Sequence, residues 1–559
     1  MTVLVKKKWT QKMSHWQKIR NNESLNNPST KKLLFIVAFI LIFLRILSYA
    51  WCSDDAYHAY VMSANLLAGK GFTPTPGIRV NVSTCPLWTL AVTLGMVVWN
   101  NAYAVGMILN LLFSGTALFT LFKFIYKKDD WFVILIAVTA ILCTSKTYLS
   151  YTTSGLENAL ILMLSSFYLT VLFKNEYFSK KELFKIALLE GLIAFTRMDC
   201  ALIFALTSAY VFLFRYKKDE KDSGKFSLNK LFQVIPIALA GLSPFILWEL
   251  FSWFYYGSFV PNTALAKLNT GFPLSDYLIR GVWYGFTSLF FDAAMLLLPI
   301  LFIIYNLAAN YRNTKILLAA LGALFYLAYI IYIGGDFMLG RHFLSLFWIA
   351  LFISSMPING RLIIPFFGTV IMLASFYCLF QINFIRSSYY DYVSNNTPCW
   401  YADEQQHYYP HTGLIPVAAD YSKNGEAKII KNHSSNGIQW FYGRKFFKVG
   451  EDETIRTSYE YRLYDPLLVR LPAVRFKDWR VGHMNRKIPE GYLETVFEGG
   501  DHIEDQDLAF YYSKLNFILS ADLFDIERLK EIVKFNNGAY DQYLNRYIEK
   551  HDLANPDEI

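Results

Sequence analysis

Two adjacent carboxylates, Asp54 and Asp55, follow a long apolar run near the start of the chain. Partial desolvation at a membrane edge raises the basicity of a carboxylate, so one of them could act as a general base or as a metal ligand. A simpler interpretation is that the pair caps a helix that starts at Ala56. Because neighbours on an extended segment point apart, we expect Asp54 to be the base and Asp55 to cap or to bind substrate.

Three cations, Arg197, Lys267 and Arg341, stand in polar clusters next to other apolar runs. Each of them alone is more often a helix anchor that reaches the membrane surface. Together, beside acidic groups, they indicate a site for phosphate, which arginine matches with a bidentate fork. These clusters and the first loop also hold further candidate substrate-binding residues, which are Arg79, Glu157, Tyr256, Asn262, Asp336 and His342.

The composition indicates a membrane protein. Of the 559 residues 54% are hydrophobic and only 17% are charged, which is too few charges for a soluble chain of this size. The net charge of +9 comes largely from the tail at residues 1–32, whose lysines and arginines suit a cytoplasmic anchor. We therefore expect membrane lipid, and no nucleic acid, as a partner of this tail.

Placement of the basic residues orients the chain. With the tail inside, the loops that hold Lys127, Lys180 and Arg312 fall inside only if the apolar run 87–99 stays outside. That run has 13 residues, a length typical of interfacial or re-entrant segments. The eleven expected spans are then 33–51, 102–126, 131–144, 156–173, 183–195, 200–214, 231–255, 289–308, 316–333, 343–356 and 362–380.

This arrangement predicts a transmembrane catalytic domain at residues 33–380 with a first outer loop at 52–101, and an extracytoplasmic α/β domain at 381–559. The candidate residues named above then gather on the outer face, where ionisable groups near the membrane are functional candidates. The chain has no P-loop, GxGxxG or HExxH motif, so a nucleotide or zinc enzyme is not indicated. No cofactor is certain, and a divalent cation stays open.

The segments DDAYHAYVMSANLLAGKGF (54–72) and PGIRVNVSTCPLWT (76–89) resemble the opening of bacterial GT-C glycosyltransferases of the arabinofuranosyltransferase-like group. Later segments resemble the family in the same order, namely SGLE (154–157), TRMD (196–199), YYGSFVPNTALAK (255–267), GGDFMLGRHF (334–343), DPLLVRLP (465–472) and WRVGHMNRKIPEGYLET (479–495). The chain departs from the family pattern at Ile78, Asn81, Cys85-Pro86 and Met198. These departures leave the donated sugar open.

The resemblance implies a GT-C fold of about eleven transmembrane helices with helices lying at the outer face. It also implies transfer of arabinofuranose, or a related pentose or hexose, from a polyprenyl-phosphate donor. The expected acceptor is a cell-envelope glycan, lipopolysaccharide, lipid-linked glycan or glycoprotein at the bacterial inner membrane. In this reading the Asp54-Asp55 pair supplies the base.

A rival of another class is a transporter or flippase of lipid-linked glycans. It would place ionisable groups along a path across the bilayer and would show inverted repeats. The charged residues instead concentrate at the expected outer face, and no repeat is evident. The sequence therefore favours the glycosyltransferase.

Overall fold

The computed structural model describes residues 23–217, 228–309, 313–355, 373, 401–424, 465–474, 481, 484 and 486–553. Within these ranges the regular elements are helices, and strand-like pairing is limited to two isolated bridges, Phe178 with Tyr216 and Met338 with Ala402. The helical class expected for the membrane part is therefore confirmed.

The helices up to residue 268 are α2 (Glu23–Asn26), α3 (Pro28–Tyr49), α4 (Ala56–Leu67), α5 (Pro86–Val98), α6 (Ala102–Ile125), α7 (Trp131–Thr144), α8 (Lys146–Tyr151), α9 (Asn158–Lys174), α10 (Lys180–Thr196), η1 (Met198–Ala201), α11 (Leu202–Phe214), α12 (Leu228–Tyr256) and α13 (Asn262–Leu268). The later helices are α14 (Leu274–Phe291), α15 (Ala293–Ala309), α16 (Thr314–Tyr332), α17 (Phe343–Ser354), α20 (Glu404–Thr412), α21 (Leu414–Asn424), η2 (Leu468–Arg470), α25 (Tyr492–Glu498), α26 (Gln506–Ser520), α27 (Ile526–Asn536) and α28 (Asp541–Lys550).

Short polar residues fix where several long apolar helices begin. The side chains of Asn27, Asn101 and Asn313 accept hydrogen bonds from backbone amides in the first turns of α3, α6 and α16. Ser179 and Glu182 form a capping box at the start of α10. These contacts satisfy amides that a helix cannot pair internally, and so they set the start of each helix.

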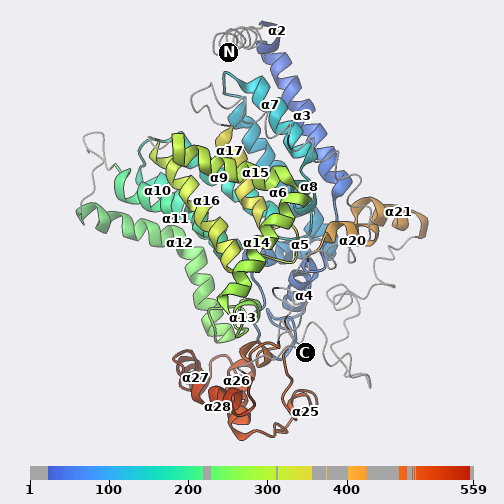
Figure 1. The fold of residues 1–559 in the computed structure, drawn as a ribbon, viewed down its shortest axis with the longest axis vertical. Helices are drawn as coiled ribbons and strands as arrows, with labels where there is room; N and C mark the ends of the chain where they lie inside the picture. Colours follow the sequence, from blue (N-terminus) through green and yellow to red (C-terminus); the bar gives the residue numbers. More distant parts are fainter. Residues whose placement is uncertain are drawn as a thin grey trace.

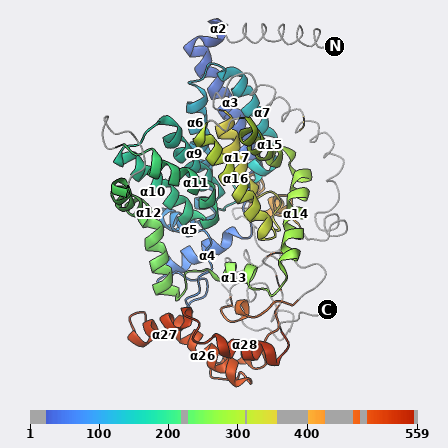
Figure 2. The same ribbon diagram turned by 60° about the vertical axis from the view of Figure 1, so that its left-hand side comes forward.

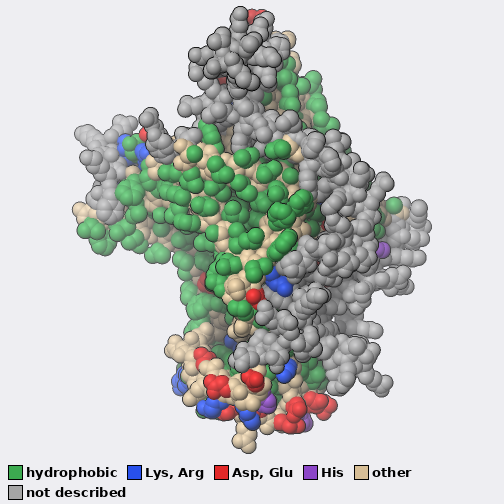
Figure 3. Space-filling model, viewed as in Figure 1, with side chains coloured by type: hydrophobic (Ala, Val, Ile, Leu, Met, Phe, Trp, Pro, Cys, Tyr) green, Lys and Arg blue, Asp and Glu red, His purple; other side chains and the backbone are tan. Residues whose placement is uncertain are grey.

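Four of the described helices, α3, α6, α12 and α16, are long and apolar enough to cross a membrane. Shorter apolar helices, which include α7, α9, α11 and α17, pack among them. Figure 3 shows hydrophobic side chains covering the middle of the molecule over the helices that Figure 1 places there. On α12, Phe232 is 73% exposed and Leu247 is 63% exposed, as expected for a surface that faces lipid. The chain is thus a helical protein with several candidate membrane spans.

Each expected span up to 343–356 overlaps a helix, and the last one, 362–380, lies outside the described residues apart from Leu373. Of the eleven expected spans, four coincide with described helices long and apolar enough to cross a membrane, or five if α14 and α15 form one bent span. The expectation for 289–308 was incomplete. A further helix, α14, precedes α15, and the two are bent by 117° at a short break. Asp292 stands at this break and accepts hydrogen bonds from Ser145 Oγ at 2.6 Å and Thr147 N at 2.9 Å. These bonds tie the bend to the start of α8.

The segment between α3 and α6 forms two helices, α4 and α5, that pack on each other. In Figures 1 and 2 both lie between the apolar helices and the red C-terminal helices. The run expected at 87–99 is indeed a helix of 13 residues, α5. Its place relative to a bilayer stays a prediction.

The region from residue 401 on falls into two parts. Helices α20 and α21 pack beside α3, whereas α25 to α28 form the end of the molecule below α13 in Figure 1. We expected an α/β domain here, but the described residues of this region are helical and contain no strand. Segment 425–464 lies outside the described residues.

Candidate active site

A cavity of about 790 Å³ lies where α4, the loop before α5, parts of α10, α12 and α13, and the loop before α17 meet. This volume is in the range of sites that hold small organic ligands. Seven of the residues singled out from the sequence line it, and these are Asp55, Glu157, Arg197, Lys267, Asp336, Arg341 and His342. They come from five separate stretches of the chain, so the fold gathers them at one place.

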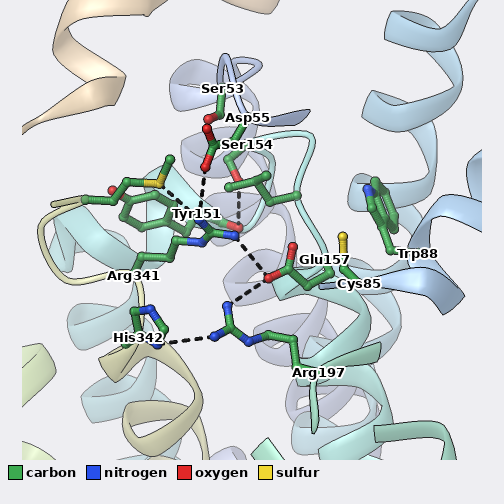
Figure 4. Close-up of polar contacts among 12 residues, drawn as sticks. Ser53, Asp55, Cys85, Trp88, Tyr151, Ser154, Glu157, Arg197, Arg341 and His342 are labelled. Atoms are coloured by element: carbon green, nitrogen blue, oxygen red, sulfur yellow. Dashed lines mark hydrogen bonds and ion pairs between the residues drawn. The ribbon is translucent and has the colours of Figure 1, made fainter. Parts of the chain in front are cut away.

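Glu157 lies at the centre of the charged network (Figure 4). Its side chain is 1% exposed, and its Oε1 accepts from Arg197 Nη1 at 3.0 Å and from Arg341 Nη2 at 3.2 Å. Its Oε2 is buried and has no hydrogen-bond partner within the described ranges. Removing a carboxylate from water is costly, and the two guanidinium groups offset that cost.

Arg341 connects this centre to two further carboxylates. Its Nη1 lies 3.5 Å from Asp55 Oδ2 and 3.9 Å from Asp336 Oδ2. Arg197 is held by Asp199 as well, through Nε at 3.0 Å and Nη2 at 2.6 Å. Both arginines are therefore already engaged with carboxylates.

His342 joins the network in a tautomer that its partners define. Arg197 Nη2 donates to its Nδ1 at 3.3 Å, so the ring proton is on Nε2, which lies 3.2 Å from Asp336 Oδ2. Burial lowers the pKa of His342, and Arg197 lowers it further, so the ring is neutral at neutral pH. The neutral ring thus turns its Nε2–H side toward Asp336, although Asp336 Oδ2 has no hydrogen-bond partner among the described residues.

Lys267 differs from the two arginines. Within the described part of the chain its ammonium makes no ion pair or hydrogen bond, although its charge acts on Asp336. Burial raises the pKa of Asp336, but Lys267, His342 and Arg341 together hold it well below its usual range. Lys267 is therefore the cation in the cavity that is available to bind an anion.

The two adjacent carboxylates are placed differently. Asp55 occupies the N-cap position of α4 without a capping hydrogen bond from its side chain, and it lines the cavity. Asp54 is not among the lining residues. The pair therefore presents one carboxylate, Asp55, to the cavity.

A close approach of backbone fixes the loop that carries Glu157. Gly155 has φ of +74°, and a Cβ there would meet Ala56 Cβ, Cys52 Sγ and Tyr60 Oη at 2.8 Å. Its carbonyl accepts from Trp88 Nε1 at 3.0 Å. Only glycine fits this position, and the contact brings the start of α9 against the start of α4.

Three predicted site residues lie outside the cavity. Arg79, Tyr256 and Asn262 line a smaller pocket against the C-terminal helices instead. Arg79 donates to the carbonyls of Ile518 and Ala521, and Tyr256 donates to the carbonyl of Phe72. Arg79 and Tyr256 thus connect separate segments of the fold.

Several cavity residues were not among the sequence candidates, and they include Asn81 in the first loop, Asp199 beside Arg197 and Glu249 on α12. The signal for Glu249 is present in the sequence, since it is an ionisable residue in the middle of an apolar run. Asn81 carried only the weaker signal of a departure from the family pattern. The described part of the chain holds no group of three His, Cys, Asp or Glu residues suited to a metal ion.

Comparisons with protein-family models, with curated proteins and with solved structures give no match to this chain.

Proposed function

We propose that the chain is a membrane glycosyltransferase that moves a sugar from a polyprenyl-phosphate donor to a hydroxyl group of an acceptor glycan or lipid. The observation that carries the proposal is the cavity in which Asp55 and Lys267 accompany two buried arginines beside apolar helices. A transfer of this kind needs a base, a cation for the leaving phosphate and access for a lipid.

In the proposed step Asp55 accepts the proton of the acceptor hydroxyl. The hydroxyl oxygen forms a bond to the anomeric carbon of the donor, and the bond from that carbon to the phosphate oxygen breaks. The electron pair leaves with polyprenyl phosphate, whose charge Lys267 stabilises. The position of Asp55 in the cavity supports it over Asp54 as the base.

Arg341 has a second task in this proposal. Its guanidinium holds Asp55 at 3.5 Å while it also contacts Glu157 at 3.2 Å, so the base is positioned by a buried network. Preorganised charges of this kind need no rearrangement when the reaction begins. Arg197, which pairs with Glu157 and Asp199, completes the network.

Apolar residues at the edge of the cavity support a lipid donor. Met198, Leu202, Phe259, Val260 and Leu268 line the cavity and are also among the exposed large hydrophobic residues, with Leu268 57% exposed. The cavity therefore opens along an apolar edge, where a polyprenyl chain would remain in contact with membrane lipid.

The proposal includes the topology argued from the sequence. The basic tail is cytoplasmic, the cavity faces the extracytoplasmic side of a bacterial inner membrane, and the C-terminal region lies outside. This places the acceptor among the glycans of the cell envelope.

The test measures release of free polyprenyl phosphate from a glycosylated polyprenyl phosphate by the purified full chain, with and without an acceptor glycan. Asp55→Asn should reduce release at least a hundredfold, because a general base typically contributes roughly that much. Asp54→Asn is the matched control and should retain activity. Full activity of Asp55→Asn would remove Asp55 as the base, and intact glycolipid that crosses a liposome membrane would indicate a carrier.

A further inference from the structure

The side-chain oxygen of Asn81 has no hydrogen-bond partner among the residues that the structure describes. It is 3% exposed, lines the cavity and donates from Nδ2 to Ser252 Oγ at 2.8 Å. Ser252 itself donates to the carbonyl of Ser258 at 2.6 Å. Since the hydroxyl proton of Ser252 is used there, its oxygen must accept from Asn81, and this fixes which end of the amide is the oxygen.

The consequence is an unusual buried atom. Asn81 Oδ1 has no hydrogen-bond partner within the described residues. A buried acceptor without a donor typically costs about 1–3 kcal/mol, so such groups call for an explanation. A ligand that donates a hydrogen bond in the cavity would remove this cost.

Glu249 is the second such group. It lines the same cavity from α12, one of the helices apolar enough to cross a membrane. No ion pair or hydrogen bond of its carboxylate is present in the part of the chain that the structure describes. A carboxylate in such a helix is costly and indicates a function.

Helix geometry brings the two groups together. Glu249 and Ser252 are three residues apart on α12 and so lie on one face, and Ser252 holds Asn81. Phe245 precedes Glu249 by four residues on that face and lines the cavity with Trp248. One corner of the cavity therefore combines two acceptor groups with two aromatic rings.

We propose that Asn81 and Glu249 bind the hydroxyl groups of a sugar in the cavity, an inference that rests on the proposed function. A sugar offers several hydroxyl donors together with apolar C–H groups, which pack well against aromatic rings. A phosphate group offers acceptor oxygens and negative charge, so this corner disfavours it. In this proposal Lys267 binds the phosphate, and Asn81 and Glu249 bind the sugar beside α12.

The sugar could be that of the donor or that of the acceptor, and the test separates these sources. Binding to the purified full chain is measured for bare polyprenyl phosphate and for the same lipid carrying one glucose or arabinofuranose. The Michaelis constant for an acceptor glycan is measured in parallel. The variants are Asn81→Leu and Glu249→Leu, with Lys267→Met as the control for the phosphate.

Asn81→Leu and Glu249→Leu should each weaken binding of a glycosylated lipid about tenfold or more, the value of one hydrogen bond involving a charged or buried group. Their affinity for bare polyprenyl phosphate should be unchanged, which also shows that the cavity is folded. Lys267→Met should weaken binding of both the bare and the glycosylated polyprenyl phosphate. A rise confined to the acceptor's Michaelis constant would assign the corner to the acceptor sugar.

Two results would overturn the inference, and they can be told apart. In the first result, Lys267→Met weakens binding of both lipids, but Asn81→Leu and Glu249→Leu change neither glycolipid binding nor the Michaelis constant for the acceptor glycan. The proposed sugar site is then wrong, whereas the proposed glycosyltransferase function is not affected. If the wild-type chain binds none of the lipids, the proposed function fails, and the sugar site fails with it.

Discussion

Asp336 shows how burial and pairing oppose each other at a single carboxylate. Its side chain is 1% exposed, which by itself would favour the protonated acid. Lys267, His342 and Arg341 outweigh burial and hold the pKa of Asp336 below its usual value of 3.8. The carboxylate is therefore ionised in the folded protein throughout the physiological range.

This lowered pKa predicts a dependence of stability on acid. A carboxylate whose pKa falls on folding stabilises the protein fully above its unfolded pKa, and the stabilisation is lost as the pH falls toward the folded pKa. We expect the wild-type chain to lose stability below about pH 4. Asp336→Asn should be less stable at pH 7 but should lose less between pH 5 and pH 3.

Thermal unfolding of both proteins in detergent, followed at several pH values, checks this. An equal loss of stability in acid for the two proteins would show that other carboxylates dominate the response.

For single residues, the sequence indicated which residue types a site would use better than it indicated which of them would lie in the cavity. Arg197, Lys267 and Arg341 stood out as charges beside apolar runs, and the structure brings all three to one cavity. Arg79 and Tyr256 had equal local signals, yet they contact the C-terminal helices. That difference depends on contacts between residues hundreds of positions apart, which no local pattern contains.

Among the elements, α20 has a role that its position in the chain did not suggest. Thr412, at its end, donates from Oγ1 to the carbonyl of Cys52 at 2.6 Å, in the loop that leads to Asp55. Two residues before its start, Ala402 N donates to the carbonyl of Phe337 at 2.7 Å, in the loop that carries Asp336 and Arg341. One short helix therefore fastens two loops of the cavity.

We therefore expect Thr412→Val to lower kcat of the proposed transfer roughly ten- to hundredfold, because small displacements of a catalytic group have effects of that size. The Michaelis constant for the lipid should change little, since Lys267 is untouched. Steady-state release of polyprenyl phosphate measures both constants. Thr412→Ser keeps the hydroxyl and should retain activity, so an equal loss in both variants would contradict the positioning role.

The elements themselves were largely foreseeable, and the exceptions have physical reasons. Long apolar runs such as α3 and α6 are recognisable from composition alone. Helix α14 was missed because its apolar residues cover only part of its surface and are interrupted by Asp276 and Arg280. The role of α20 was hidden because it depends on hydrogen bonds to distant loops.

For the whole molecule, buried arginines join the C-terminal helices to the membrane part. Arg528 is fully buried and donates from Nη2 to the carbonyls of Phe254 and Tyr255 at 3.0 and 2.9 Å, at the end of α12. Its Nε donates to the carbonyl of Ile518 at 2.8 Å in α26. A single side chain of α27 thus links the backbone of α12 to that of α26.

Arg528→Met should loosen this junction by about 3 kcal/mol, because the carbonyls that it serves lose their donor in a buried place. Limited proteolysis of the purified chain should then cut between α21 and α28 faster than in the wild type. Arg546→Met is the matched control, since Arg546 is half exposed and forms an ion pair with Asp507. Equal proteolysis of all three proteins would show that apolar packing alone holds the junction.

Because Arg197 and Arg341 share one oxygen of Glu157, the interaction energies of the two arginines are coupled. Both guanidinium groups compete for Oε1, at 3.0 and 3.2 Å, so a ligand that draws one away leaves the carboxylate more tightly held by the other. The free energies of substitutions at Arg197 and Arg341 will therefore not add. When an anion binds in the cavity, the contacts among Glu157, Arg197 and Arg341 change together. The affinity of the cavity for the anion therefore depends on all three side chains.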